Sequence, residues 1–304
     1  MKNLIRADCH LHTNASPDSN ADMEDMIKQA INLELDEICI TDHVDFPLFE
    51  DISNWEGFSF SDPAMSSGET ISDWVRPMED GKTCEVVRIP FEDYIANYIR
   101  LASVYEDKLK VRMGCEIGLS YHCSDAIHST AARFPYDFII GSLHSADCYD
   151  ICGNSRTLFC GKSKREVYAA HLNEMIQNVL SYDCFDVLGH IDYIIRYCPY
   201  EDRCMHVHEF DDLLSDLFKF LIEKGKGIEL NTSGFRYNLG HAHPHIDILR
   251  KYRGAGGEII TVGSDAHKPR DVGRFLAEAS EILLEAGFKR YCKFNKRSPV
   301  FIEL

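Results

Sequence analysis

Histidine and carboxylate side chains occur in short motifs spread over almost the whole chain. Two motifs have the form His-x-His or Asp-x-His, which aims two side chains to one face of an extended segment. The residues of the pattern are His10, His12, His43, Glu116, His144, His190, Asp265 and His267. Burying such groups unpaired would cost several kcal/mol each. Since imidazole and carboxylate bind zinc, manganese and iron, the pattern predicts a centre for two or three divalent ions.

Short apolar runs must position these residues, because each motif stands at the carboxyl end of one. The runs cover residues 4–7, 38–40, 111–115, 138–143, 185–189, 227–228 and 259–263. Continuous apolar runs of this kind are typical of parallel strands that are buried on both faces. The carboxyl ends of the strands of a parallel barrel meet at one mouth, where active sites form. We therefore expect the ligands to converge there.

Amphipathic helical patterns separate the runs. Ser163 and Glu166 form an S-x-x-E capping box before a stretch with apolar residues at helical spacing. Similar patterns cover residues 23–31, 210–221 and 275–286. The alternation of strands and helices predicts an α/β fold of seven or eight right-handed units. We expect one barrel domain over residues 1–304, a lid-like insertion at about 51–90 and a helix from Phe91 to about Tyr105.

The ordered motifs resemble those of the polymerase-and-histidinol-phosphatase (PHP) superfamily over essentially the whole chain. Gly-Ser-Leu-His144, Gly-His190-Ile-Asp-Tyr-Ile-Ile-Arg196 and Gly-Ser-Asp265-Ala-His267 look like its histidinol-phosphatase branch. The resemblance implies a distorted (β/α)7 TIM-like barrel, with a trinuclear metal site at the carboxyl ends of its strands. It also implies hydrolysis of a phosphomonoester, with L-histidinol phosphate of histidine biosynthesis as the favoured substrate.

The resemblance further implies which residues hold each ion. The first ion would take His10, His12, Glu116 and Asp265, and Glu116 would bridge to a second ion held by His144 and His190. The third ion would take His43, His267 and the residue six positions after His12, which is Asp18 here. Some PHP proteins have histidine at that position. The residue types leave zinc, manganese and iron open, because geometry and supply decide among these metals.

Other residues are candidates for the chemistry around the ions. Paired ions can bind a water, lower its pKa and hold the attacking and leaving oxygens in line. Arg156, expected in the loop after the fourth strand, and Arg196 are the candidates for bidentate phosphate contacts. We assign Asp42 and His267 to the catalytic set, and expect Asp42 to orient a neighbouring ligand.

Several further histidines and one carboxylate stand outside the matched set. His206 and His208 are expected at an exposed helix start. The tract His241-Ala-His243-Pro-His245 is interpreted as a loop, with a substrate or adventitious metal role as the alternative. Glu229 ends a run, and either supports a ligand, contacts a substrate amine or is a buried hydrogen-bonded carboxylate.

Composition narrows the partners. The chain has 304 residues and a formal net charge of −17, which argues against long nucleic acids and anionic membranes. Twelve cysteines without a C-x-x-C pair or an apparent secretory signal predict reduced thiols and a cytoplasmic protein. A small phosphorylated metabolite is the expected partner, and the oligomeric state is left open. The rival interpretations are a PHP-type nuclease or nucleotide phosphatase, and an inactive metal-binding regulatory module.

Overall fold

Seven strands form the parallel sheet that the sequence predicts. The computed structural model describes residues 4–48, 75–146 and 149–304. The sheet has the order β1-β2-β6-β7-β10-β11-β12, and a short strand, β3 (His43–Val44), also pairs with β6. The seven strands are β1 (Ala7–Leu11), β2 (Glu37–Ile40), β6 (Lys110–Gly118), β7 (Phe138–Ser142), β10 (Val187–Leu188), β11 (Gly227–Asn231) and β12 (Ile260–Gly263). Every neighbouring pair in this order is parallel.

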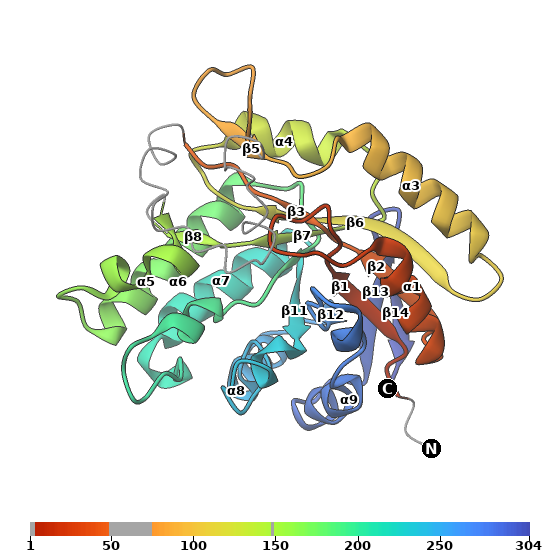
Figure 1. Ribbon diagram of the computed structural model, residues 1–304. Helices are drawn as coiled ribbons and strands as arrows, with labels where there is room; N and C mark the ends of the chain where they lie inside the picture. Colours follow the sequence, from red (N-terminus) through yellow and green to blue (C-terminus); the bar gives the residue numbers. More distant parts are fainter. Residues whose placement is uncertain (1–3, 49–74, 147–148) are drawn as a thin grey trace.

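The first and last strands approach each other, so the sheet nearly closes into a barrel (Figure 1). Just beyond β12, the backbone N–H of Asp265 donates to the carbonyl of His10, with 2.8 Å between nitrogen and oxygen. The N–H of His12 donates to the carbonyl of Ala266 at 2.9 Å. These bonds join the carboxyl ends of β1 and β12. The expected TIM-like barrel of seven parallel strands is confirmed.

Helices surround the strands (Figure 1). They are α1 (Met23–Asn32), α3 (Phe91–Val104), α4 (Ser124–Ala132), α5 (Ile151–Phe159), α6 (Lys164–Ser181), α7 (Asp211–Glu223), α8 (Ile246–Gly254) and α9 (Leu276–Glu285). The capping box at the start of α6 forms as predicted, between Ser163 and Glu166. Tyr168, Leu172 and Met175 of α6 are fully buried, because they share the face that packs on the barrel.

The strand ends differ from the expected ones in a way that matters for the ligands. The first strand was expected over 4–7, but it begins at Ala7, and Leu4 is 59% exposed. Asp8 and His10 lie inside this strand and are buried, Asp8 bonded to the backbone N–H of Ser264 and His10 bonded through Nδ1 to Glu229. Apolar character alone therefore marks the strand too early. Glu229 likewise lies within β11 and does not end it.

The insertion predicted at about 51–90 lies partly outside the described residues, so its role as a lid stays a prediction. Its described part forms an antiparallel hairpin of β4 (Val75–Pro77) and β5 (Cys84–Val86). The N–H of Val86 donates to the carbonyl of Asp45 at 3.2 Å, so this hairpin supports the segment after β3. The helix predicted after the insertion is confirmed as α3.

The remaining elements are short or lie at the carboxyl end of the chain. A small hairpin of β8 (Ser145–Ala146) and β9 (Tyr149–Asp150) precedes α5. A final hairpin pairs β13 (Arg290–Asn295) with β14 (Ser298–Glu303). Among the described residues, no helix combines the length and the apolar character that crossing a membrane requires.

Candidate metal centre

Glu116 is the middle of the site, and its two carboxylate oxygens face different histidines. Oε1 lies 2.9 Å from Nε2 of His190 and 3.2 Å from Nε2 of His144. Oε2 lies 2.9 Å from Nδ1 of His43 and 3.2 Å from Nε2 of His10. Glu116 is fully buried in β6, where the register of β3 sets His43 directly beside it. A carboxylate in this arrangement can bridge two ions, as the sequence predicts.

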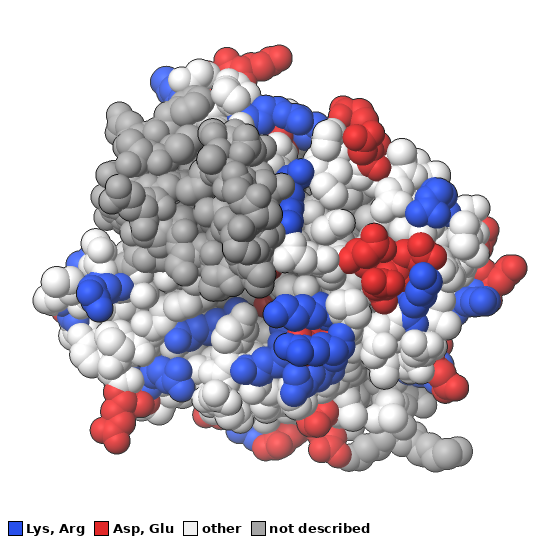
Figure 2. All heavy atoms as spheres, in the orientation of Figure 1, with Lys and Arg blue, Asp and Glu red and all other residues white. Residues whose placement is uncertain are grey.

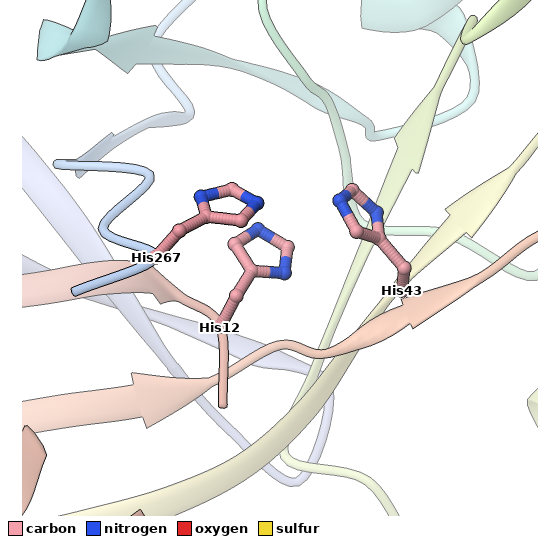
Figure 3. Close-up of side chains that lie close together, drawn as sticks. All are labelled: His12, His43 and His267. Carbon is pink, nitrogen blue, oxygen red and sulfur yellow. The ribbon is translucent and has the colours of Figure 1, made fainter. Parts of the chain in front are cut away.

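The potential ligand atoms form compact groups around this carboxylate. In each group the atoms lie within 4.8 Å of one another. The groups of the described residues are His10–His12–Asp265, Glu116–His144–His190, His12–His43–His267 and His43–Asp45–His144. Figure 3 shows the third group, in which rings from β3, from the end of β1 and from the segment after β12 point toward one another. The structure thus brings together nine residues from distant parts of the sequence.

Several ligand atoms are buried without a hydrogen-bond partner, although buried polar groups are almost always paired. They are Nε2 of His10, His12 and His267, Nδ1 of His43, and Oε2 of Glu116. An unpaired buried donor or acceptor costs about 1–3 kcal/mol. Divalent cations would satisfy all of these atoms at once, so the donor set fits a metal centre.

The titration of the cluster reflects the same need for positive charge. Burial raises the pKa of Glu116, but the imidazoles of His10, His144 and His43 outweigh it and hold that pKa well below its usual value. Burial lowers the pKa of His144, but Glu116 and Asp45 together raise it to about 10. The ionised carboxylates of the site must be balanced by positive charge, which either protonated imidazoles or metal ions can supply.

The nitrogens on the far side of the ligating rings are also oriented. Nδ1 of His10 lies 2.6 Å from Oε1 of the buried Glu229, and Oε2 of the same carboxylate accepts from the N–H of His190 at 3.1 Å. Nδ1 of His267 lies 3.0 Å from the carbonyl of Asp265. These partners fix the tautomer of a histidine and turn its other nitrogen toward a metal. Of the roles left open for Glu229, support of a ligand is the one that the geometry favours.

Asp42 acts on the centre through a hydroxyl group. Its Oδ1 accepts from Oγ of Ser16 at 2.6 Å and from the N–H of Thr13 at 2.5 Å. Oγ of Ser16 in turn lies 3.1 Å from Nδ1 of His12. The expected orienting role therefore has a route, although one hydroxyl stands between Asp42 and the ligand. Membership of Asp42 and His267 in the catalytic set stays a prediction.

Asp18 borders the centre at its exposed side. Its Oδ2 lies 3.0 Å from Nε2 of His267 and 3.6 Å from Nε2 of His43, and the side chain is 46% exposed. Burial raises its pKa, but His267 and His43 together hold that pKa well below the usual value. The compact group around these two histidines contains His12, however, and not Asp18. The sequence linked His12 to the first ion alone, because its spacing does not reveal that its ring stacks 4.1 Å from that of His267.

Asp45 is the residue of the centre that the sequence did not single out. Its Oδ1 lies 3.1 Å from Nδ1 of His144, and its Oδ2 lies 4.0 Å from Nδ1 of His43. A Cβ atom at Gly118 would stand 2.1 Å from Oδ1 of Asp45, so the glycine in β6 leaves room for this carboxylate. The available signal was the spacing His43-x-Asp45, which repeats the one-residue gap of the other ligand pairs.

The two candidate phosphate-binding arginines have different surroundings. Arg196 lies in the 3₁₀ helix η4 (Tyr193–Tyr197), and its Nη2 is 3.3 Å from Oδ2 of Asp265 at the centre. Its guanidinium carbon lies 4.8 Å and 4.1 Å from the ring centres of Tyr193 and Tyr237. Arg156 was expected in a loop, but it is exposed in α5, because residues 151–159 continue as a helix after the β8–β9 hairpin.

The histidines outside the matched set separate into exposed and buried ones. His206 precedes the short 3₁₀ helix η5 (Val207–Glu209) and the exposed His208 lies within it, just before α7, so both stand near a helix start as predicted. The 241–245 tract precedes α8, as expected for a loop, but His243 within it is fully buried. Its Nδ1 lies 2.5 Å from Oδ1 of Asp192, and burial lowers its pKa to about 4.

The nearly closed parallel barrel and its buried imidazole–carboxylate cluster define a divalent-metal protein. A family model described as "PHP domain" matches residues 8–233, and the chain belongs to this family.

Relatives of the chain match it over almost its whole length. A protein of Lactococcus lactis named "Histidinol-phosphatase" is 25% identical over 96% of this chain and 95% of its own length. A protein of Clostridium acetobutylicum named "Probable histidinol-phosphatase" is 26% identical over 97% and 96%. The crystal structure of a histidinol phosphate phosphatase from Lactococcus lactis, complexed with zinc, L-histidinol and phosphate, superposes with a TM-score of 0.78. It is 23% identical and covers 98% of this chain and 100% of that one.

Proposed function

We propose that this protein is a metal-dependent phosphomonoesterase that hydrolyses L-histidinol phosphate to L-histidinol and inorganic phosphate. The observation that carries the proposal is the buried Glu116 carboxylate between two sets of histidines, where Nε2 of His10, His12 and His267 and Nδ1 of His43 are buried without a hydrogen bond. The relatives support the choice of substrate, since they are named as histidinol-phosphatases and match nearly the full length of the chain.

We assign the following roles to the residues of the site. His10, His12, Glu116 and Asp265 would hold one ion, Glu116, His144 and His190 a second, and His43, His267 and Asp18 a third. The ions, zinc, manganese or iron, would lower the pKa of a water toward neutrality and offset the negative charge of the phosphoryl group. Arg196 would bind a phosphate oxygen and orient the ester, because a guanidinium suits phosphate and its Nη2 already stands beside Asp265.

The charge distribution supports a small substrate over a long nucleic acid. On the face in Figure 2, Lys and Arg side chains gather near the middle, and acidic and uncharged groups interrupt them elsewhere. With a formal net charge of −17, the protein would capture an anion at the metal centre and Arg196 instead of along a broad basic surface. This distinguishes the proposal from the nuclease alternative.

The test is phosphate release by the zinc- or manganese-loaded protein from L-histidinol phosphate, nucleoside monophosphates and single-stranded DNA. We expect the highest kcat/KM with L-histidinol phosphate, and a loss of at least about hundredfold in a His10→Ala variant. The exposed His208 supplies the matched control, because a His208→Ala variant keeps every candidate ligand. Preferred turnover of nucleotides would contradict the substrate, and unchanged activity in His10→Ala would favour an inactive centre with activity from a contaminant.

The two arginines are compared in the same assay. An Arg196→Ala variant is expected to lose about 10- to 100-fold in kcat/KM, since a hydrogen bond to a charged group is worth about 1.5–3 kcal/mol. An Arg156→Ala variant tests whether the exposed guanidinium of α5 reaches the substrate. An Arg196→Ala variant with full activity would remove this residue from the phosphate site.

A further inference from the structure

Arg196 is held by more protein groups than a phosphate-binding arginine requires. Its Nε donates to Nε2 of His243 at 2.9 Å, and its Nη2 donates to Oγ of Ser233 and to Oδ2 of Asp265. Within the described part of the chain, its Nη1 makes no hydrogen bond to protein. Two of its three nitrogens are therefore committed to protein, and one is left for a ligand.

The bond from Arg196 determines the tautomer of His243. Arginine nitrogens only donate, so Nε2 of His243 must be the acceptor and its Nδ1 must carry the proton. That proton points to Oδ1 of Asp192, which lies 2.5 Å from Nδ1. The other oxygen of Asp192 accepts from the backbone N–H of His245 at 3.1 Å. Since His243 and Asp192 are both fully buried, no water competes for these bonds.

The ligands of the metal centre leave this pair unused. The groups of ligand atoms in the described residues contain neither His243 nor Asp192. A buried aspartate–histidine pair that served packing alone would not need a third member. Here Nε2 of His243 accepts a hydrogen bond from the side chain of Arg196, which lies beside the candidate ligand Asp265.

We propose that Asp192 and His243 are positioning residues that lock the guanidinium of Arg196 in the orientation in which it binds the phosphate group. The inference rests on the proposed function, because it assumes that phosphate is the group that Arg196 receives. The lock saves the conformational entropy that a long side chain would otherwise lose when the ligand binds. It also prevents Arg196 from turning fully onto Asp265 and neutralising a metal ligand.

The Asp192→Asn variant tests the lock by reversing a tautomer. The N–H of His245 can only donate, so the amide oxygen of the new side chain takes that bond and its NH2 group faces Nδ1 of His243. The imidazole proton must then move to Nε2, where it opposes the N–H of Arg196. A His243→Leu variant removes the acceptor outright. A His243→Gln variant retains one acceptor and one donor and serves as the conservative rescue.

Two measurements on the zinc-loaded protein, freed of excess metal, test the positioning of Arg196 without a turnover assay: the tautomer of His243 and the affinity for phosphate. Nitrogen NMR of selectively labelled histidine, assigned by comparison with His243→Gln, should give a neutral His243 with the proton on Nδ1. Calorimetric titration with inorganic phosphate should give a Kd about tenfold weaker in Asp192→Asn and His243→Leu, because a hydrogen bond to a charged group is lost. His243→Gln should stay close to wild type.

His241 provides the matched control, because it belongs to the same tract and, among the described residues, its hydrogen bond is to the carbonyl of Ala242 and not to Arg196 or Asp192. A His241→Leu variant should bind phosphate as the wild type does. Zinc content should be equal in all variants, which separates the lock from damage to the metal centre. A proton on Nε2 in the wild type, or unchanged phosphate binding in both Asp192→Asn and His243→Leu, overturns the inference. Absence of histidinol phosphate turnover in a wild type that binds phosphate normally rejects the proposed substrate alone.

Discussion

At the scale of single residues, two buried glutamates, on the separate barrel strands β6 and β11, have different roles in one centre. Both carboxylate oxygens of Glu116 face candidate ligands. Glu229 instead forms hydrogen bonds with Nδ1 of His10, on the side of the ring away from Glu116, and with the backbone N–H of His190. Gly263 leaves the space for this contact, because a Cβ atom there would stand 2.6 Å from Oε1 of Glu229. The side of the ring that each carboxylate meets decides its role.

A Glu229→Gln variant measures the supporting contact. The amide keeps the volume of the side chain but removes the charge that orients His10, so we expect metal affinity to fall about 10- to 100-fold. Competition with a chromophoric chelator gives the zinc dissociation constant. The exposed Glu278 of α9 is the control, as Glu278→Gln should leave that constant unchanged. Equal zinc affinity in Glu229→Gln would mean that Glu229 is only a buried, hydrogen-bonded group.

At the scale of elements, the contact between β1 and the end of β12 holds most of the ligand pairs in place. Oδ1 of Asp8 accepts from the N–H of Ser264 at 2.8 Å, and Oδ2 accepts from Oγ of Ser264 and the N–H of Gly273. One carboxylate on β1 thus fixes the segment that carries Asp265 and His267. The first and last strands must be aligned to within a residue for the His-x-His and Asp-x-His pairs to meet.

An Asp8→Ala variant should weaken the contact between β1 and the segment after β12, which we call the seam of the barrel. Four donors, among them the N–H of His10, would lose their acceptor, so we expect the free energy of unfolding to fall by about 2–4 kcal/mol. Urea denaturation of the metal-free protein provides the measurement. Asp36 is the matched control, because it forms an ion pair with Arg6 in which both side chains are at least half exposed, at 63% and 50%. Asp36→Ala should cost less than about 1 kcal/mol, and an equally small loss in Asp8→Ala would show that the seam does not depend on this carboxylate.

At the scale of the whole molecule, the buried cluster ties the stability of the barrel to its ions. The candidate ligands come from β1, β3 and β6 and from the segments that follow β1, β3, β7, β10 and β12, so they join the first part of the chain to the last. Ions that bind only the folded state would stabilise all of these elements together.

Metal removal should therefore lower the melting temperature. At about 1,000 times the dissociation constant, a bound ligand adds about 4 kcal/mol of stability, which corresponds to a drop of roughly 5 °C or more on chelation. Calorimetry of the zinc-loaded and chelated protein measures the difference, and added zinc should restore it. A His10→Ala variant should respond less. A melting temperature indifferent to chelation would mean that the centre does not hold its ions in the folded state.

The sequence by itself predicted the barrel, the helix that follows the insertion and eight of the residues that cluster at the centre, because each depends on local pattern. Apolar runs and helical periodicity need no knowledge of distant residues, and the His-x-His and Asp-x-His spacings aim side chains together within one strand. The motif order supplied the rest through its resemblance to the PHP superfamily.

Only the tertiary structure decided which residues support those ligands. Asp45 meets His144, and Asp192 meets His243 and through it Arg196, across long stretches of sequence. Apart from the His43-x-Asp45 spacing, nothing local marks these partners, since an aspartate or a histidine in a polar segment has the same pattern whether solvent or another side chain satisfies it. The same lack of local signal hid the helix that carries Arg156 and the second neighbour set of His12. Ligand identity is local in the chain, but ligand orientation depends on contacts that exist only after the barrel closes.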